Sequence, residues 1–228
     1  MKTIVATLLA TLTVGGLFYM NTRTPSNTDY DMYVFAVQWG KTMCLDGSKD
    51  VCPEKLPAIP NNKISIHGLW PNLQSGKYLP DCNQGTEIEV VDDGSEMFET
   101  MKKYWVSLAN TDEYFWTHEF NKHGYCYSTD YKEYFQTALD VFFDKNIPDI
   151  ITDIWGEQTG DFVVPYDEFV SKLNERFGGQ FYTPKCKKYN GKYYLNEIRI
   201  ALDLDFNYIE AKLGNSCNSK YDVVIPYW

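Results

Sequence analysis

The residues from Phe115 to Cys126 hold the side chains of this chain that are best suited to acid–base chemistry. Two of the three histidines lie here, together with a glutamate and a lysine. If the segment is helical, His118 lies beside Lys122, because residues four positions apart are neighbours on a helix surface. Glu119 lies beside His123 for the same reason. A buried helix with a polar outer face would explain the aromatic residues of this stretch, but not why the scarce histidines gather in it.

The third histidine, His67, is in a segment over 63–69 that predicts a short strand, with isoleucines on one face and Ser65 and His67 on the other. Gly68 would let a ligand or another backbone come close. A lone histidine on a strand is more often structural than catalytic, but a site with two facing imidazoles from both segments has to use His67. Two imidazoles suit cleavage of a phosphodiester, because one can take a proton from the attacking hydroxyl while the other protonates the leaving oxygen. A nearby cation would balance the charge that builds on the phosphorane.

These residues need elements to position them, and the central one is a helix over 112–123. Phe115, Trp116 and Phe120 would anchor it in a core, and Gly124 would end it by taking the left-handed conformation. Further helices are predicted over 96–109, 131–144 and 165–177, with loops over 44–60 and 71–94. Strands are predicted over 30–39, 63–69, 193–208 (with a register break near Asn196) and 223–228. Helices in the middle and strands at both ends favour an α+β fold.

Composition limits the class of protein. A chain of 228 residues suits one domain with a sizeable core, here expected over 23–228. Its formal charge of -10 and sequence pI of about 4.8 exclude a basic coating that grips duplex DNA nonspecifically. A nucleic-acid substrate would have to be held by a local site, or met at acidic pH.

The N-terminus predicts a signal peptide over approximately 1–22, because Lys2 precedes an apolar run over 4–19 and a polar stretch follows. A signal anchor is the alternative, since no clean small-x-small cleavage site follows the run. Six cysteines behind a signal peptide predict three disulfides in an oxidising compartment. Fifteen pairings are possible, and no Cys-x-x-Cys spacing suggests a zinc site.

Two segments resemble the active-site motifs of a known family, the T2 family of secreted endoribonucleases. Ile64 to Pro71 matches the hydrophobic-x-x-His-Gly-Leu-Trp-Pro pattern of that family. Trp116 to Cys126 is similar to its His-Glu-aromatic-x-Lys-His-Gly-x-Cys pattern, and Gln38 with Trp39 looks like its N-terminal strand. The resemblance implies an α+β fold with a central antiparallel sheet packed with several helices. It also implies metal-independent cleavage of single-stranded RNA through a 2′,3′-cyclic phosphate, with low base specificity.

The same resemblance implies the role of each catalytic residue. His123 would be the general base that removes the ribose 2′-OH proton, and His67 the general acid at the departing 5′ oxygen. Glu119 and Lys122 would stabilise the transition state. His118 would help to bind the phosphate.

Base-binding positions also follow from the resemblance. Trp70 and Tyr78 match positions that sandwich the base on the 5′ side, although ordinary packing explains Tyr78 equally well. Asn72 stands where some relatives carry aspartate, so a purine preference does not transfer directly. Gln38 and Phe115 match the second base site, and Phe115 is equally suited to a core.

The family pattern implies the disulfides Cys82–Cys126 and Cys186–Cys217, which leaves Cys44–Cys52 as the local pair. It implies no metal or other cofactor and a monomer without stable membrane association after signal cleavage. The destination would be outside the cell or in the lysosome or vacuole. RNA would be the partner and DNA would not react, because it lacks the nucleophilic 2′-OH.

Two competing interpretations remain in view. His118, Glu119 and His123 superficially resemble the metalloprotease motif, but that motif places its histidines four apart. Here they are five apart and diverge by about 140° on a helix. The other interpretation is a secreted binding or signalling protein that kept this scaffold and made catalysis secondary or lost it.

Overall fold

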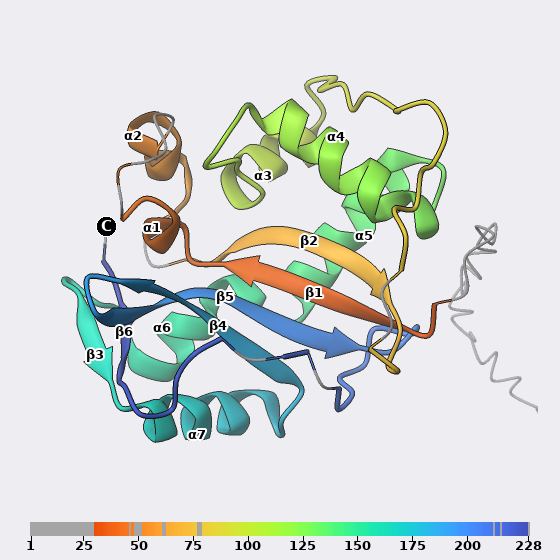
Figure 1. The fold of residues 1–228 in the computed structure, drawn as a ribbon. Coiled ribbons are helices and arrows are strands. Elements are labelled where there is room, and N and C mark those ends of the chain that lie inside the picture. Colours follow the sequence, from red (N-terminus) through yellow and green to blue (C-terminus); the bar gives the residue numbers. More distant parts are fainter. Residues whose placement is uncertain are drawn as a thin grey trace, which may run out of the picture.

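The computed structural model describes residues 30–45, 47, 52–60, 63–76, 79–211, 213–214 and 216–227. Tyr78 and the expected signal peptide lie outside these ranges. A six-stranded sheet in the order β2-β1-β5-β6-β3, with β4 paired to β5, forms the centre of the fold (Figure 1). Its strands are β1 (Met32–Gln38), β2 (Ser65–Asn72), β3 (Phe162–Val164), β4 (Tyr182–Tyr189), β5 (Lys192–Leu202) and β6 (Val223–Ile225). All pairs are antiparallel except β5 with β6.

Seven α-helices are described: α1 (Gly40–Met43), α2 (Cys52–Lys55), α3 (Glu96–Tyr104), α4 (Asp112–Lys122), α5 (Tyr131–Asp144), α6 (Ile150–Trp155) and α7 (Tyr166–Phe177). Short 3-10 turns cover Leu56–Ala58, Gly124–Cys126 and Ile147–Asp149. The α+β prediction is confirmed, and α5 and α7 lie close to the predicted helices over 131–144 and 165–177. Gly178 ends α7 with a positive φ of 74°.

Several predicted boundaries were wrong. The expected loop over 44–60 contains α2 and a 3-10 turn. The predicted helix over 96–109 stops at Tyr104, since Trp105 leaves helical geometry at φ -132° and buries its indole in the core. The strand over 193–208 ends at Leu202, because the Asp203 carboxylate accepts hydrogen bonds from the backbone of Asp205 and Asn207 and closes a turn. No strand was predicted at β4, where lysines hide the alternation.

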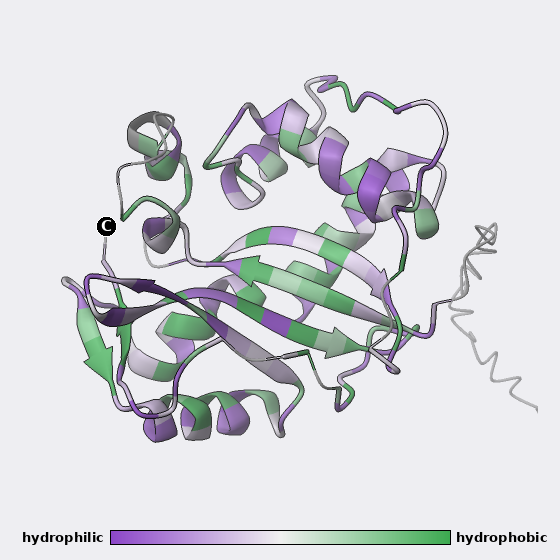
Figure 2. Ribbon diagram, in the orientation of Figure 1, coloured by the Kyte–Doolittle hydropathy of each residue, from purple (hydrophilic) through white to green (hydrophobic). Residues whose placement is uncertain are grey.

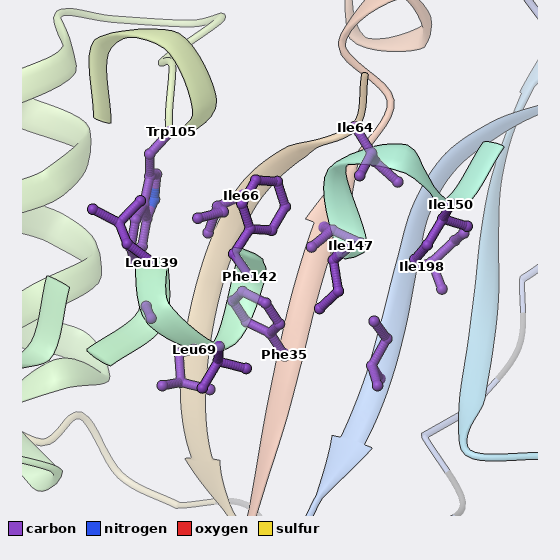
Figure 3. Close-up of a cluster of buried hydrophobic side chains, with 14 of the residues drawn as sticks. Phe35, Ile64, Ile66, Leu69, Trp105, Leu139, Phe142, Ile147, Ile150 and Ile198 are labelled. Atoms are coloured by element: carbon purple, nitrogen blue, oxygen red, sulfur yellow. The ribbon is translucent and has the colours of Figure 1, made fainter. Parts of the chain in front are cut away.

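The main core lies between the sheet and the helices. Figure 3 shows side chains of β1, β2 and β5 meeting those of the helical layer, with Phe35, Ile66 and Ile198 among the labelled contacts. The opposite sheet face carries a smaller cluster of Met32, Val34 and Ala201. This second face is left largely uncovered by α-helices in Figure 1, and it carries His67 and Trp70. The core therefore fixes the sheet from one side while the polar residues gather on the other.

Three disulfides tie the loops to this frame, with the pairs that the family resemblance implies: Cys44–Cys52, Cys82–Cys126 and Cys186–Cys217. Cys82–Cys126 joins the loop after β2 to the turn that follows α4. The same loop is held by backbone hydrogen bonds from Cys82 to the Lys122 carbonyl (3.0 Å) and from Asn83 to the Asn121 carbonyl (2.8 Å). The C-terminal end of α4 is therefore fixed from outside the helix.

Candidate active site

His67 is the extra residue of a β-bulge. Ala36 of β1 lies opposite Gly68, and the next residue, Val37, lies opposite Ile66, so β2 has one more residue than β1 at His67. A bulge changes the direction of a side chain without ending the strand pairing, and bulges are frequent next to active sites. The carbonyl of His67 is held by the Trp105 indole at 2.9 Å. The strand thus presents a half-buried imidazole from a rigid backbone.

Two carboxylates flank this imidazole. Glu197 Oε2 lies 2.6 Å from Nδ1 of His67, and Glu119 Oε1 lies 3.8 Å from Nε2. Burial alone would lower the pKa of His67, but the hydrogen bond to Glu197 and the nearby charge of Glu119 outweigh it, so the pKa is raised above its ordinary 6.5. His67 therefore favours the protonated form.

Glu197 and Arg199 are functional candidates that sequence reasoning missed. Both lie on β5, on the sheet face that His67 occupies. Arg199 Nε donates to Glu197 Oε1 at 2.5 Å, and its guanidinium lies 5.1 Å from the Trp70 ring centroid. Leu195 and Glu197 lie opposite consecutive β4 residues, which leaves Asn196 as a second bulge, at the predicted register break. The available signal was a glutamate and an arginine that alternate with Ile198 and Ile200.

Trp70 and Glu119 form the third side of the site. The Trp70 indole donates to Glu119 Oε2 at 2.8 Å. A Cβ at Gly68 would lie 2.3 Å from both the Glu119 Oε2 and the Trp70 Nε1 atoms, so only glycine permits this hydrogen bond. Burial raises the pKa of Glu119, opposed by the charge of His67 and the hydrogen bond from Trp70.

His123 ends α4 with φ -128°. The prediction that Gly124 stops the helix in a left-handed conformation was wrong, since Gly124 is not among the described residues with positive φ and starts a 3-10 turn. Glycine is needed there for space, because a Cβ would lie 2.7 Å from the Tyr134 ring and 2.8 Å from Phe120. This close packing lets the turn follow His123 directly.

Both imidazoles lie next to Trp70. Ring centroids of Trp70 and His123 are 5.1 Å apart, and those of Trp70 and His67 are 5.0 Å apart. Burial lowers the pKa of His123 to about 3, reinforced by the positive charges of Lys122 and His67. Between about pH 3 and the raised pKa of His67, His123 is therefore neutral while His67 is charged.

A cleft of about 250 Å³ opens beside His123, and Trp70, Asn72 and Lys122 also contribute to its lining. His118 is exposed on α4, near enough for its charge to lower the pKa of His123. Phe115 is half-buried with its ring 5.8 Å from that of His67. The catalytic and phosphate-binding candidates therefore gather from β2 and α4.

The base-binding candidates lie at different places in the structure. Gln38 is buried at the end of β1, opposite Ser65 on one side and Glu197 on the other. Asn72 accepts a hydrogen bond from the backbone of Leu73 through its Oδ1 atom. Trp70 is enclosed by the two histidines and Arg199, which makes it a wall of the site.

No group of three or more His, Cys, Asp or Glu residues in the described ranges is arranged to hold a metal ion. Nor does any helix of this part of the chain have the length and apolar character to cross a bilayer.

The model of the ribonuclease T2 family matches residues 30–217. Intracellular ribonuclease LX of Solanum lycopersicum is 29% identical over 206 residues, which cover 86% of this chain and 85% of that protein. Extracellular ribonuclease LE of the same plant is 29% identical over 184 residues, covering 77% of each. A solved structure of a ribonuclease from the seeds of bitter gourd is similar with a TM-score of 0.66 at 22% identity, covering 85% of this chain and 99% of that one.

Proposed function

Because the chain belongs to the ribonuclease T2 family and is thus an endoribonuclease, we propose that the site between β2 and α4 cleaves single-stranded RNA by transesterification. The ribose 2′-oxygen attacks the adjacent phosphorus, the bond from phosphorus to the 5′ oxygen breaks, and a 2′,3′-cyclic phosphate is formed. No metal takes part in this proposal. DNA would not react, since it has no 2′-OH.

The opposite pKa shifts of the two histidines carry the proposal. A general base has to be neutral and a general acid protonated at the same pH, and environments that push two pKa values apart assign those roles. His123, with a pKa of about 3, is the base that takes the 2′-OH proton. His67, with a raised pKa, is the acid that protonates the 5′ oxygen. The roles reverse if water then opens the cyclic phosphate.

Glu119 and Lys122 would stabilise the phosphorane. Lys122 is at the end of α4 and lines the cleft with His123, so its ammonium can meet the negative oxygens. Burial keeps the pKa of Glu119 raised, so at acidic pH a fraction of its carboxyl groups carries a proton that can be donated to a phosphorane oxygen. His118, exposed one turn before Lys122, would bind the phosphate of the substrate before reaction.

Base recognition would be weak in this site. Asn72 offers both a donor and an acceptor at the cleft, which suits more than one base. Aromatic stacking is tolerant of sequence. We assign Trp70 and Asn72 to the first base site, and Gln38 and Phe115 to the second. The chain would act as a monomeric single domain over 23–228, delivered through the secretory pathway to the outside of the cell or to a lysosome or vacuole.

Digestion of a defined RNA tests the reaction. We expect full cleavage in the presence of EDTA, with products that end in 2′,3′-cyclic phosphate, identified by mass spectrometry. An RNA of the same sequence with 2′-O-methyl groups should stay intact, because the nucleophile is blocked. Loss of activity in EDTA that zinc or magnesium restores would contradict the mechanism.

The two pKa shifts also predict the pH dependence. With rising pH, kcat/KM should increase as His123 loses its proton near pH 3, and should fall as His67 loses its proton above pH 6.5. The maximum is therefore expected in the acidic range. A dinucleotide assay from pH 3 to pH 9 measures both limbs, and a maximum above pH 8 would refute the assignment.

The Glu197→Gln variant measures how much Glu197 of β5 contributes to this pH profile. Removing the carboxylate removes the hydrogen-bonded charge that raises the pKa of His67, so the alkaline limb should move to lower pH. The acid limb should stay in place, because Glu197 is not among the main causes of the His123 shift. Glu99→Gln, an exposed carboxylate of α3, is the matched control and should move neither limb.

A further inference from the structure

The hairpin of β4 and β5 has a charge unlike the rest of the chain. Residues 182–202 contain five lysines and arginines and a single carboxylate, Glu197, although the whole chain has a formal charge of -10. Four of these cations are Lys185, Lys187, Lys188 and Lys192, and Figure 2 shows the hydrophilic colour along β4. A local cationic segment in an acidic protein attracts an anion that the rest of the surface repels.

Part of this charge faces the same way as the active site. Opposite residues of an antiparallel pair share a face, and Lys185 lies opposite Glu197, which contacts His67. Cys186 packs against the core, so Lys187, the next residue, points to the site-bearing face. Tyr194 lies opposite Lys187.

Contacts hold the first of these cations in place. The Lys185 ammonium donates to the carbonyls of Leu213 and Gly214. Arg199, two residues beyond Glu197 on β5, also shares this face and contacts Trp70. A line of positive groups therefore runs from Arg199 at the catalytic residues through Lys185 to Lys187, and the exposed Lys192 lies at the turn. Five residues along β5, from Arg199 to Tyr194, correspond to about 17 Å.

A cleft beside the first part of α4 has the opposite charge. Glu87, Glu89 and Glu113 line a cleft beside α4, together with Thr111, Tyr114 and Thr117. Phosphates that leave the catalytic site toward this cleft would be repelled. Phosphates that leave toward the β4–β5 hairpin would meet cations and the ring of Tyr194, on which a base can stack.

Resting on the proposed ribonuclease function, we infer that the site-bearing face of the β4–β5 hairpin, from Arg199 through Lys185, Lys187 and Tyr194 to Lys192, binds the part of a single-stranded RNA that extends beyond the cleaved linkage. The enzyme would therefore prefer long RNA over a dinucleotide, and this preference would depend on salt.

The double variant Lys187→Gln/Lys192→Gln tests this surface against Lys103→Gln/Lys172→Gln, two exposed lysines on α3 and α7 with the same change in charge. We expect kcat/KM for a 20-nucleotide RNA at low salt to fall on the order of tenfold only in the hairpin variant. Its log–log salt slope should lose about 1.4, because each lost phosphate contact on a single strand contributes about 0.7. Dinucleotide cleavage should remain within about twofold of the unmodified protein.

Binding of a 20-nucleotide DNA, followed by fluorescence anisotropy, gives a readout that does not need cleavage. DNA presents the same phosphates and stacking bases without the 2′-OH, so it should bind more weakly to the hairpin variant than to the control variant. Failure of the unmodified protein to cleave the dinucleotide would overturn the proposed function, whereas equal effects of both double variants on long RNA and DNA would overturn this inference alone. If the hairpin variant aggregates and its DNA binding does not change selectively, these lysines protect an edge strand from pairing with other chains. That result would also overturn the inference.

Discussion

Replacing either His67 or His123 by alanine should lower kcat by roughly 10²–10⁴, the usual contribution of a positioned acid or base. We expect no other imidazole to replace either group, because the remaining histidine, His118, is exposed on α4. Single-turnover cleavage of a dinucleotide measures the loss without interference from product release. Near-normal activity in either variant would remove that residue from the mechanism.

The double variant sharpens this test. Since the two imidazoles act in one proton-transfer reaction, His67→Ala/His123→Ala should lose less than the product of the single losses. Tyr114→Ala, an exposed aromatic residue on the same helix as His118, is the control and should retain activity. His118→Ala should chiefly raise KM, because its proposed contact is with the phosphate of the bound substrate. Strictly multiplicative losses for the two histidines would show that they serve separate steps.

Gly68→Ala should lower kcat by about 10²-fold, although it adds only one methyl group at a residue that takes no part in the reaction. The new Cβ would lie 2.3 Å from both Glu119 Oε2 and Trp70 Nε1, so the hydrogen bond between them has to break or shift. Displacement of a catalytic group by about 1 Å can cost this much activity. Overpacking should also lower the free energy of unfolding by about 1–3 kcal/mol, measured by urea denaturation.

Two further variants keep the Gly68 prediction testable if the protein is destabilised. Gly160→Ala adds the same methyl group where a Cβ would meet nothing within 4 Å, and it should change neither kcat nor stability. In the Trp70→Phe background, which lacks the Nε1 atom, Gly68→Ala should cost less than in the unmodified protein, as residues in contact are not additive. Equal costs in both backgrounds would contradict the proposed steric cause.

The amino-acid sequence was a good guide wherever structure is decided locally. Tyr131 to Asp144 has helical apolar spacing and forms α5 with these bounds, because an amphipathic stripe needs only a core to cover it. The spacing of Glu119 and Lys122 on one short helix also follows from helix geometry alone. Local sequence patterns predicted the ends of elements less well. At Trp105, a tertiary hydrogen bond to the carbonyl of His67 holds the residue outside the helix.

The sequence by itself determined which side chains are available for chemistry: three histidines, a glutamate and a lysine in two motifs. Only the tertiary structure decided how the pKa values of these side chains differ. The bulge at His67 depends on the register of β2 against β1, and Glu197 reaches it from β5, about 130 residues along the chain. The carboxylates that charge His67, and the burial that keeps His123 neutral, come from elements distant in sequence. The pKa of a histidine is set by the groups that surround it in space, so the family resemblance could imply which histidine is acid and which is base, but only the fold supplied the physical reason.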